Sequence, residues 1–136
     1  MQDQVNPVVT LHVCVTCRRG DEPLEPKDGR SGFKMQLALA EAISQGQAAS
    51  IDLRPAECLS GCKRGCAIAL VAPGKWSYVI ADLDPECHAA DILTFAEQYS
   101  SHPTGVPAWS ERPAIVKKSV LARVPPISLP GSEEAA

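Results

Sequence analysis

The distribution of apolar and polar positions predicts a chain that alternates strands with helices. A stretch rich in β-branched residues, 7–15, is typical of a buried strand. Apolar residues at helical spacing predict a helix over 33–46, which Ser31 can cap and Gly46 can end. The apolar face of this helix is expected to comprise Phe33, Met35, Leu37, Leu39, Ala40 and Ile43.

The middle of the chain predicts a strand, a hairpin and a second helix. Apolar and polar residues alternate in 49–58, which predicts a short strand that Pro55 terminates. Apolar arms at 67–71 and 76–81 flank a Pro-Gly-Lys turn and predict an antiparallel hairpin. The second helix is expected to have Asp84 as its cap, Pro85 at its first position and a buried stripe of Ile92, Phe95, Ala96 and Tyr99.

This order of elements predicts an α/β fold with a mixed sheet. A right-handed crossover makes the first two strands parallel neighbours, and the hairpin adds antiparallel strands. The order, βα followed by ββα, is that of a thioredoxin-like sheet with about four strands and two main helices. We expect the domain to span 1–101 and the Pro-rich segment 102–136 to form an extended, partly ordered tail, held on the domain through Trp109 and Val120 or Leu121.

Chain length and net charge argue against several classes of function. With 136 residues, the chain suits a single domain. Its net charge of -3 and pI of about 5.6 give no general attraction for nucleic acid or for an anionic membrane. The start of the sequence does not have the pattern of a signal peptide, and no apolar run approaches the roughly 20 residues of a membrane-spanning helix. We therefore expect a cytoplasmic protein whose six cysteines are reduced and serve metal binding or redox chemistry.

Four of these cysteines follow the first two strands in pairs. Cys14 and Cys17 come after the first strand with two residues between them, and Cys58 and Cys62 come after the second with three. Because parallel neighbours end at the same edge of a sheet, the two loops emerge together. The sequence therefore predicts that four thiols converge on one site.

Three kinds of chemistry suit such a site. Thiolates are ligands for tetrahedral zinc and for iron-sulfur clusters alike, and both pairs have spacings found in zinc sites. Cys14 and Cys17 could instead be a thiol-disulfide pair, but the predicted helix begins about a dozen residues later, whereas a reactive thiolate of that type relies on a helix N-terminus directly beside it. No phosphate loop, Gly-x-Ser-x-Gly or His-Glu-x-x-His motif is present, so nothing in the sequence indicates an enzyme.

A resemblance to a known family favours the iron-sulfur cluster. The stretch ECLSGCKRGCAIALVAPGKWSYVIADLDPECHAADILTFAEQY resembles the second half of the thioredoxin-like 2Fe-2S ferredoxins and of the related small iron-sulfur subunit of respiratory NADH dehydrogenase. HVCVTCRRG resembles the end of their first strand, and the chain is most similar to a small bacterial family of predicted metal-binding proteins of this type. The resemblance implies an electron carrier that holds a 2Fe-2S cluster through Cys14, Cys17, Cys58 and Cys62, and it implies a homodimer. The runner-up is a zinc or other metal-binding module that stores, delivers or senses metal with the same thiols, and a thiol-disulfide protein is third.

The remaining candidates flank this site. Cys66 is either a buried apolar residue or an alternative ligand, since the related proteins have a small residue or proline there. Cys87 is expected to be structural and buried, and His12 and His88 have no partner at ligand spacing. Basic residues next to the two pairs either form an ordinary solvated loop surface, or they raise the potential of an anionic cluster and dock an acidic protein redox partner. They are Arg18, Arg19, Lys63 and Arg64.

Overall fold

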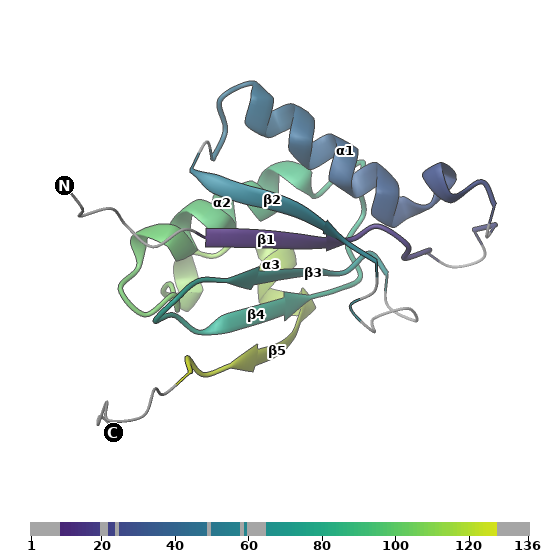
Figure 1. The fold of residues 1–136 in the computed structure, drawn as a ribbon. Helices are drawn as coiled ribbons and strands as arrows, with labels where there is room; N and C mark the ends of the chain where they lie inside the picture. The colour runs from purple at the N-terminus through teal and green to yellow at the C-terminus, as the bar shows by residue number, and fades with distance from the viewer. Residues whose placement is uncertain are drawn as a thin grey trace.

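A five-stranded mixed sheet with helices behind it forms the protein, seen here in a computed structural model (Figure 1). The structure describes residues 9–19, 22–23, 25–48, 50–57, 59 and 65–127. The strands are β1 (Val9–Cys14), β2 (Ile51–Ala56), β3 (Ile68–Val71), β4 (Ser77–Ile80) and β5 (Val120–Val124), in the spatial order β2-β1-β3-β4-β5. The helices are α1 (Ser31–Ser44), α2 (Ala89–Ser101) and α3 (Ala114–Ser119), with short 3-10 turns η1 (Lys27–Gly29) and η3 (Trp109–Glu111).

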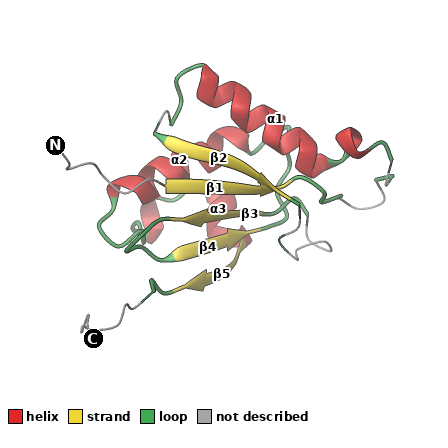
Figure 2. Ribbon diagram, in the orientation of Figure 1, coloured by secondary structure: helices red, strands yellow, loops and turns green. Residues whose placement is uncertain are grey.

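The topology agrees with the predicted α/β arrangement. β1 and β2 are parallel neighbours joined through α1, and Cys14 pairs in register with Ala56. β3 is antiparallel to β1, β4 to β3 and β5 to β4 (Figure 2). The carboxyl ends of β1 and β2 therefore lie side by side, at the end of the sheet where the chain turns toward α1 (Figure 1).

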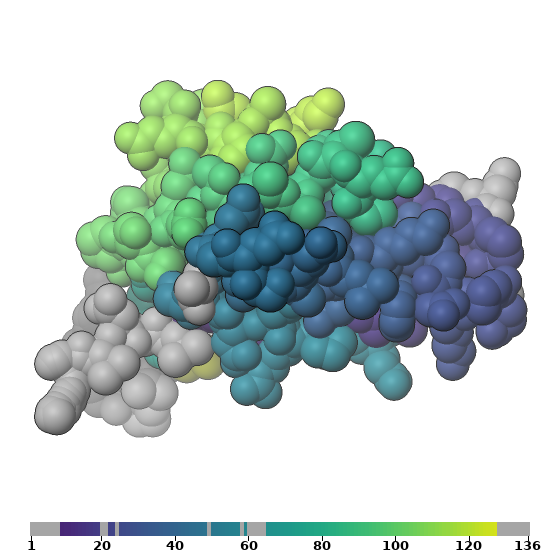
Figure 3. Space-filling view, turned by 90° about the horizontal axis from the view of Figure 1, so that it is seen from above, coloured from purple at the N-terminus to yellow at the C-terminus, as the bar shows by residue number. Residues whose placement is uncertain are grey.

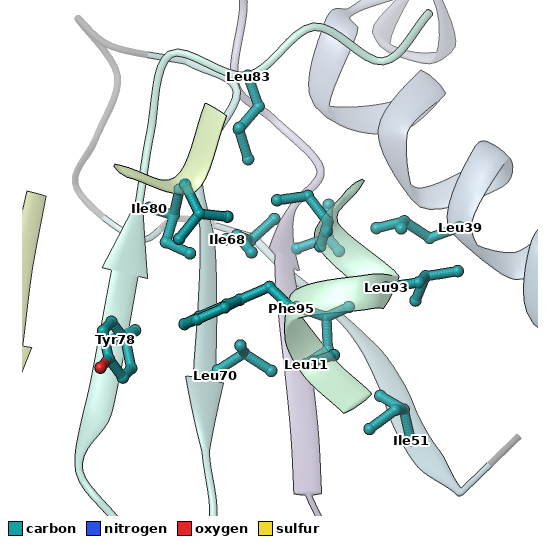
Figure 4. Close-up of a cluster of buried hydrophobic side chains, with 14 of the residues drawn as sticks. Leu11, Leu39, Ile51, Ile68, Leu70, Tyr78, Ile80, Leu83, Leu93 and Phe95 are labelled. Atoms are coloured by element: carbon teal, nitrogen blue, oxygen red, sulfur yellow. The ribbon is translucent and has the colours of Figure 1, made fainter. Parts of the chain in front are cut away.

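The core lies between one face of the sheet and the helices. α2 contacts both α1 and α3, so the helices make one layer, which the space-filling view shows from above (Figure 3). Every second residue of β1 faces this layer and is buried. Phe95 of α2 points across the sheet toward Tyr78 of β4, with 5.2 Å between ring centres in an edge-to-face contact (Figure 4). The predicted stripe of α2 is confirmed, since Ile92, Phe95, Ala96 and Tyr99 are fully buried.

Local details of both long helices differ from the sequence prediction. α1 buries Met35 and Leu39 and leaves Leu37 55% exposed, because only one side of its broad apolar face meets the sheet and α2. Ser31 does not cap α1 with its side chain; Arg30 occupies the capping position. α2 begins after a turn at Asp84, so His88 stands at its capping position and Asp84 does not.

The strand β2 continues through Pro55, which was predicted to end it. β2 is at the edge of the sheet, where a residue without an N–H group can face outward at no cost to the ladder. No helix in the described part of the chain is long and apolar enough to cross a bilayer.

The segment after 101 is more structured than the predicted extended tail. It forms α3 and β5. The sheet therefore has five strands, where about four were predicted, and the described chain has three helices, where two main ones were predicted. Ile115 and Val116 hold it on the core, with Val120 packed beside them. The other predicted anchors are largely exposed, Trp109 by 59% and Leu121 by 44%.

Candidate metal centre

Two cysteine sulfurs meet at the carboxyl end of β1. Cys14 is the last residue of β1 and Cys17 lies in the turn that follows, with 2.8 Å between their Sγ atoms. Both side chains are buried, at 0% and 2% exposure. The Cys17 N–H group donates to the Cys14 carbonyl oxygen at 3.4 Å and closes the turn, while the Cys14 N–H group donates to Ala67 O at 3.0 Å. The sheet and the turn thus present the two thiols as a pair.

The loop after β2 rests on this turn. Val15 N–H donates to Ala56 O at 2.9 Å, and the Thr16 hydroxyl donates to Glu57 O. Leu59 packs against the two cysteines in a small cluster that includes Ala67 and Ala81. Cys58 and Cys62 lie outside the described residues, as do Lys63 and Arg64. The described residues on both sides of Cys58 therefore contact the Cys14–Cys17 turn.

Two glycines allow close approach of the backbone to the turn. A Cβ atom at Gly65 would lie 2.6 Å from Arg18 O and 2.8 Å from the Cys17 Cβ atom. A Cβ atom at Gly32, in the first turn of α1, would lie 2.0 Å from Cys14 O. At such distances any side chain would force the backbone to shift, so both positions favour glycine. The end of the loop after β2 and the start of α1 thus enclose the cysteine pair from two sides.

The environment gives the two thiols different pKa values. Burial opposes ionisation of Cys14, but hydrogen bonds from the Cys17 thiol and from the backbone of Leu59 and Thr16 lower the pKa of Cys14 overall. Burial, and then the neighbouring Cys14, raise the pKa of Cys17 to about 12, although the backbone of Ala67 donates a hydrogen bond to it. Cys14 therefore ionises more readily than Cys17, and both thiols would lose their protons when a metal binds.

Cys66 lies close to this pair but belongs to the main core. Its side chain is fully buried among the residues that the helices cover, and its pKa is raised by this burial to about 12. Its backbone exchanges two hydrogen bonds with Leu83, at 3.3 and 3.2 Å. It is two residues before Ile68 and shares its face of the sheet, whereas Cys14 belongs to the small cluster outside the main core.

The expectation that Cys87 is buried is wrong. Cys87 is exposed in the turn before α2, with its Sγ atom 3.7 Å from a carboxylate oxygen of Asp84, and that negative charge raises the pKa of Cys87. His88 accepts a hydrogen bond from Asp84 N–H at 2.8 Å, and His12 is half-buried on the sheet face opposite Leu11. Within the described residues, no three His, Cys, Asp or Glu side chains are grouped closely enough to hold a metal ion.

Charged residues around the Cys14–Cys17 turn form an ion pair and hydrogen bonds with one another and with nearby backbone groups. Arg19 pairs with Asp84 at 3.4 Å, and the Arg18 guanidinium donates to Glu22 O at 2.6 Å. The Glu22 carboxylate accepts hydrogen bonds from Arg19 N–H and from both the N–H group and the hydroxyl of Ser31. Glu22 thereby ties the segment after Cys17 to the start of α1.

Arg30 is the functional candidate that the sequence analysis missed. It is 9% exposed, and its Nη1 atom donates to Thr16 O at 3.1 Å, inside the turn that joins the two cysteines. In the sequence DGRSG it stands between polar residues and glycines, as a surface arginine would, so no local pattern would have singled it out.

Comparisons with known proteins agree with this architecture. The family described as "Protein of unknown function (DUF1636)" matches residues 11–126. A thioredoxin-like [2Fe-2S] ferredoxin from Aquifex aeolicus superposes with a TM-score of 0.56 over 89% of this chain and 97% of its own, at 18% identity. A 1.5 Å crystal structure of the wild-type ferredoxin of this kind from the same organism gives a TM-score of 0.52 over 84% and 96%, also at 18% identity. Comparison with curated proteins gives no match. The resemblance inferred from the sequence is confirmed for the fold.

Proposed function

We propose that this chain, which belongs to the family described as "Protein of unknown function (DUF1636)", is an iron-sulfur electron carrier. It would bind a 2Fe-2S cluster through Cys14, Cys17, Cys58 and Cys62. The observation that carries the proposal is the buried cysteine pair, with 2.8 Å between sulfurs, at the shared end of two parallel strands in a fold like that of a [2Fe-2S] ferredoxin.

The donor set fits the cluster. Thiolate sulfur is the ligand that iron-sulfur clusters take, and the first pair is already assembled and shielded from water. Cys58 is bonded to Glu57 and Leu59, both of which contact the turn that carries the first pair. Cys62 is three residues from Leu59 and from Gly65, a reach of about 10 Å at full extension. The second pair therefore needs no long excursion of the chain to complete the set.

The protein supplies the surroundings that such a cluster needs. Backbone groups of Thr16, Leu59 and Ala67 hydrogen-bond to the sulfurs of Cys14 and Cys17 and would stabilise added negative charge on them. Leu59 and Ala81 keep water from the sulfurs on the side of the small cluster. A bound 2Fe-2S cluster would supply one-electron redox chemistry, and we propose no substrate pocket and no enzymatic step.

Anaerobic purification and spectroscopy test the proposal. We expect a brown protein with visible absorption and a rhombic electron paramagnetic resonance signal after reduction with dithionite. A colourless protein with stoichiometric zinc would overturn the proposal in favour of a zinc site on the same thiols.

Single serine replacements test the ligand set. Replacing any of Cys14, Cys17, Cys58 or Cys62 should abolish the chromophore, because each removes one thiolate. Loss of the cluster in Cys66→Ser together with a full cluster in Cys17→Ser would show that the proposed set is wrong.

The same end of the molecule is our proposed docking surface for an acidic protein redox partner. Of its four basic residues, Arg18 and Arg19 are half-exposed, and Arg19 is 3.4 Å from Asp84. Because long-range attraction is screened by salt, Arg19→Glu should slow electron transfer most at low ionic strength, in stopped-flow mixing with candidate partners. Equal rates for both proteins at every salt concentration would contradict this surface. The expected homodimer rests on the resemblance, and sedimentation velocity tests it.

A further inference from the structure

The buried guanidinium of Arg30 lies beside the peptide between the two cysteines. Arg30 is 9% exposed, although arginine is among the residues least often buried. Its backbone is held on both sides, since Arg30 N–H donates to Lys27 O at 3.2 Å and Lys34 N–H donates to Arg30 O at 3.1 Å. The side chain therefore extends from a fixed point at the start of α1 to the cysteine turn.

The contact of Arg30 with Thr16 O fixes the orientation of one peptide plane. The Thr16 carbonyl and the Cys17 N–H group belong to the same rigid peptide unit. Arg30 Nη1 holds the carbonyl end at 3.1 Å, and Cys14 O holds the N–H end at 3.4 Å. With both ends of this plane held, the position of the Cys17 Cα atom is fixed relative to Cys14.

The start of α1 also holds the next peptide. Gly32 N–H donates to Cys17 O at 3.0 Å, so the carbonyl groups on both sides of the Cys17 Cα atom are bound by residues 30 and 32. Arg30 and Gly32 act on neighbouring peptides from the same helix terminus. The arrangement ties the spacing of the two sulfurs to the docking of α1.

The charge of Arg30 has a second consequence. Its guanidinium is a positive charge next to the turn that carries Cys14 and Cys17. Arg30 Nη2 lies 4.0 Å from Glu25 Oε2, whose side chain is 73% exposed. Thiolate ligands that bind metal at this turn bring negative charge to the region where the guanidinium lies.

We propose that Arg30 is a positioning residue of the metal centre, which presets the Cys14–Cys17 spacing through the Thr16 carbonyl and places a positive charge beside the ligated thiolates. This inference rests on the proposed use of the two cysteines as ligands, but it holds for any thiolate-bound metal. It predicts that metal affinity and reduction potential depend on Arg30 more than folding does.

Cobalt titration of the metal-free protein tests the inference without a cluster. Co²⁺ bound by thiolates gives sulfur-to-metal charge-transfer absorption, so its affinity reports on the ligands directly. Arg30→Gln should weaken Co²⁺ binding about tenfold or more, as loss of residues that orient ligands does. Arg30→Lys, which keeps the charge but lacks the planar fork, should fall between Arg30→Gln and the unaltered protein.

Arg112→Gln is the matched control. Arg112 also donates to a backbone carbonyl, with Nε and Nη2 at 3.1 and 3.0 Å from Pro107 O, but it lies over the rings of Tyr78 and Phe95. It should lower thermal stability and leave Co²⁺ affinity unchanged. Equal Co²⁺ affinities in Arg30→Gln and Arg112→Gln would overturn the inference. If Arg30→Gln does not fold, Arg30→Lys decides: reduced affinity supports the inference and unaltered affinity refutes it.

Cluster reconstitution separates this inference from the proposed function. In cluster-loaded protein, Arg30→Gln should lower the reduction potential, because a positive charge near the anionic cluster is lost, and Arg112→Gln should not. A protein that accepts no cluster but binds Co²⁺ in an Arg30-dependent way would refute the proposed function and support the inference. A cluster-loaded Arg30→Gln variant with unaltered reduction potential and unaltered Co²⁺ affinity would support the proposed function and refute the inference. A protein that binds neither metal nor cluster would overturn both.

Discussion

Replacing Gly32 by alanine places one methyl group against the cysteine turn. The new Cβ atom would lie 2.0 Å from Cys14 O, whereas unstrained carbon–oxygen contacts are about 3.3 Å, so α1 and the turn must separate by about 1 Å. Overpacking costs about 1–3 kcal/mol and the weakened bond from Gly32 N–H to Cys17 O about 1 kcal/mol more, against a gain of about 0.5–1 kcal/mol for alanine over glycine in a helix. We expect a net loss of about 2 kcal/mol, which lowers the melting temperature by about 8 °C.

Gly29→Ala is the control for this prediction, since its Cβ atom would meet nothing closer than 3.8 Å. Thermal melts of the metal-free proteins by circular dichroism give the stability, and iron and sulfide per chain after anaerobic reconstitution give the occupancy. Gly32→Ala should melt lower than the unaltered protein and bind less cluster, whereas Gly29→Ala should match it in both. The sign of the stability change decides the test, because alanine in place of Gly32 would raise stability if the close contact with Cys14 O were absent. A Gly32→Ala variant with an unchanged or higher melting temperature and full occupancy would refute the argument.

Three further predictions follow from single contacts. Lys75→Met should lower the free energy of unfolding by about 2–3 kcal/mol in denaturant titration, because the buried ammonium donates to three carbonyl groups at the end of α2. As a control, Lys118→Met at an exposed position should change the free energy of unfolding by less than about 0.5 kcal/mol. Hydrogen bonds, chiefly from Ser31, hold the pKa of Glu22 below its usual value despite burial, so its stabilisation is complete above the ordinary pKa of about 4.3 and is lost as pH falls through the folded-state pKa. The stability difference between the unaltered protein and Glu22→Gln should therefore shrink on acidification, and a constant difference from pH 7 to pH 3 would contradict it. Cys87→Ser should keep the full chromophore, because Cys87 is exposed beside Asp84, and bleaching of this variant would place Cys87 among the ligands.

The buried face of a helix was predictable from the sequence where its apolar residues form one narrow stripe. In α2 the stripe was narrow, and all its residues are buried, although Leu93, which lies outside the predicted stripe, is buried as well. In α1, apolar residues cover more than one side, and helical spacing alone could not select Met35 and Leu39 over Leu37. The choice depends on which side meets the sheet and α2, a contact between distant parts of the chain.

The C-terminal segment shows the same limit. Frequent prolines in 102–136 suggested an extended tail, and local propensity offers little against that interpretation. β5 forms because β4 offers an unpaired edge, and Ile115 and Val116 fill the end of the core. A strand whose partner is supplied by the fold need not have a strong pattern of its own.

Part of the candidate site could likewise be predicted from the sequence, and part depended on tertiary contacts. The spacing of Cys14 and Cys17, and their place after a strand that runs parallel to the next, followed from local pattern and from the handedness of crossovers. The roles of Arg30 and Gly32 did not, because both are 14 or more residues from the groups that they contact in the Cys14–Cys17 turn. The exposure of Cys87 likewise depends on the turn at Asp84, which replaces the first helical turn predicted there.

By itself, the sequence determined the alternation of strands and helices, the parallel pairing of the first two strands and the thiols that could bind metal. These properties depend on residue type at short spacing and on the chirality that every L-polypeptide shares. Only the tertiary structure decided which side of α1 is buried, that the last segment completes the sheet, and that the start of α1 lies against the cysteine turn. The contacts that decide these features join residues far apart in the chain, and their free energies appear only when the core brings those residues together.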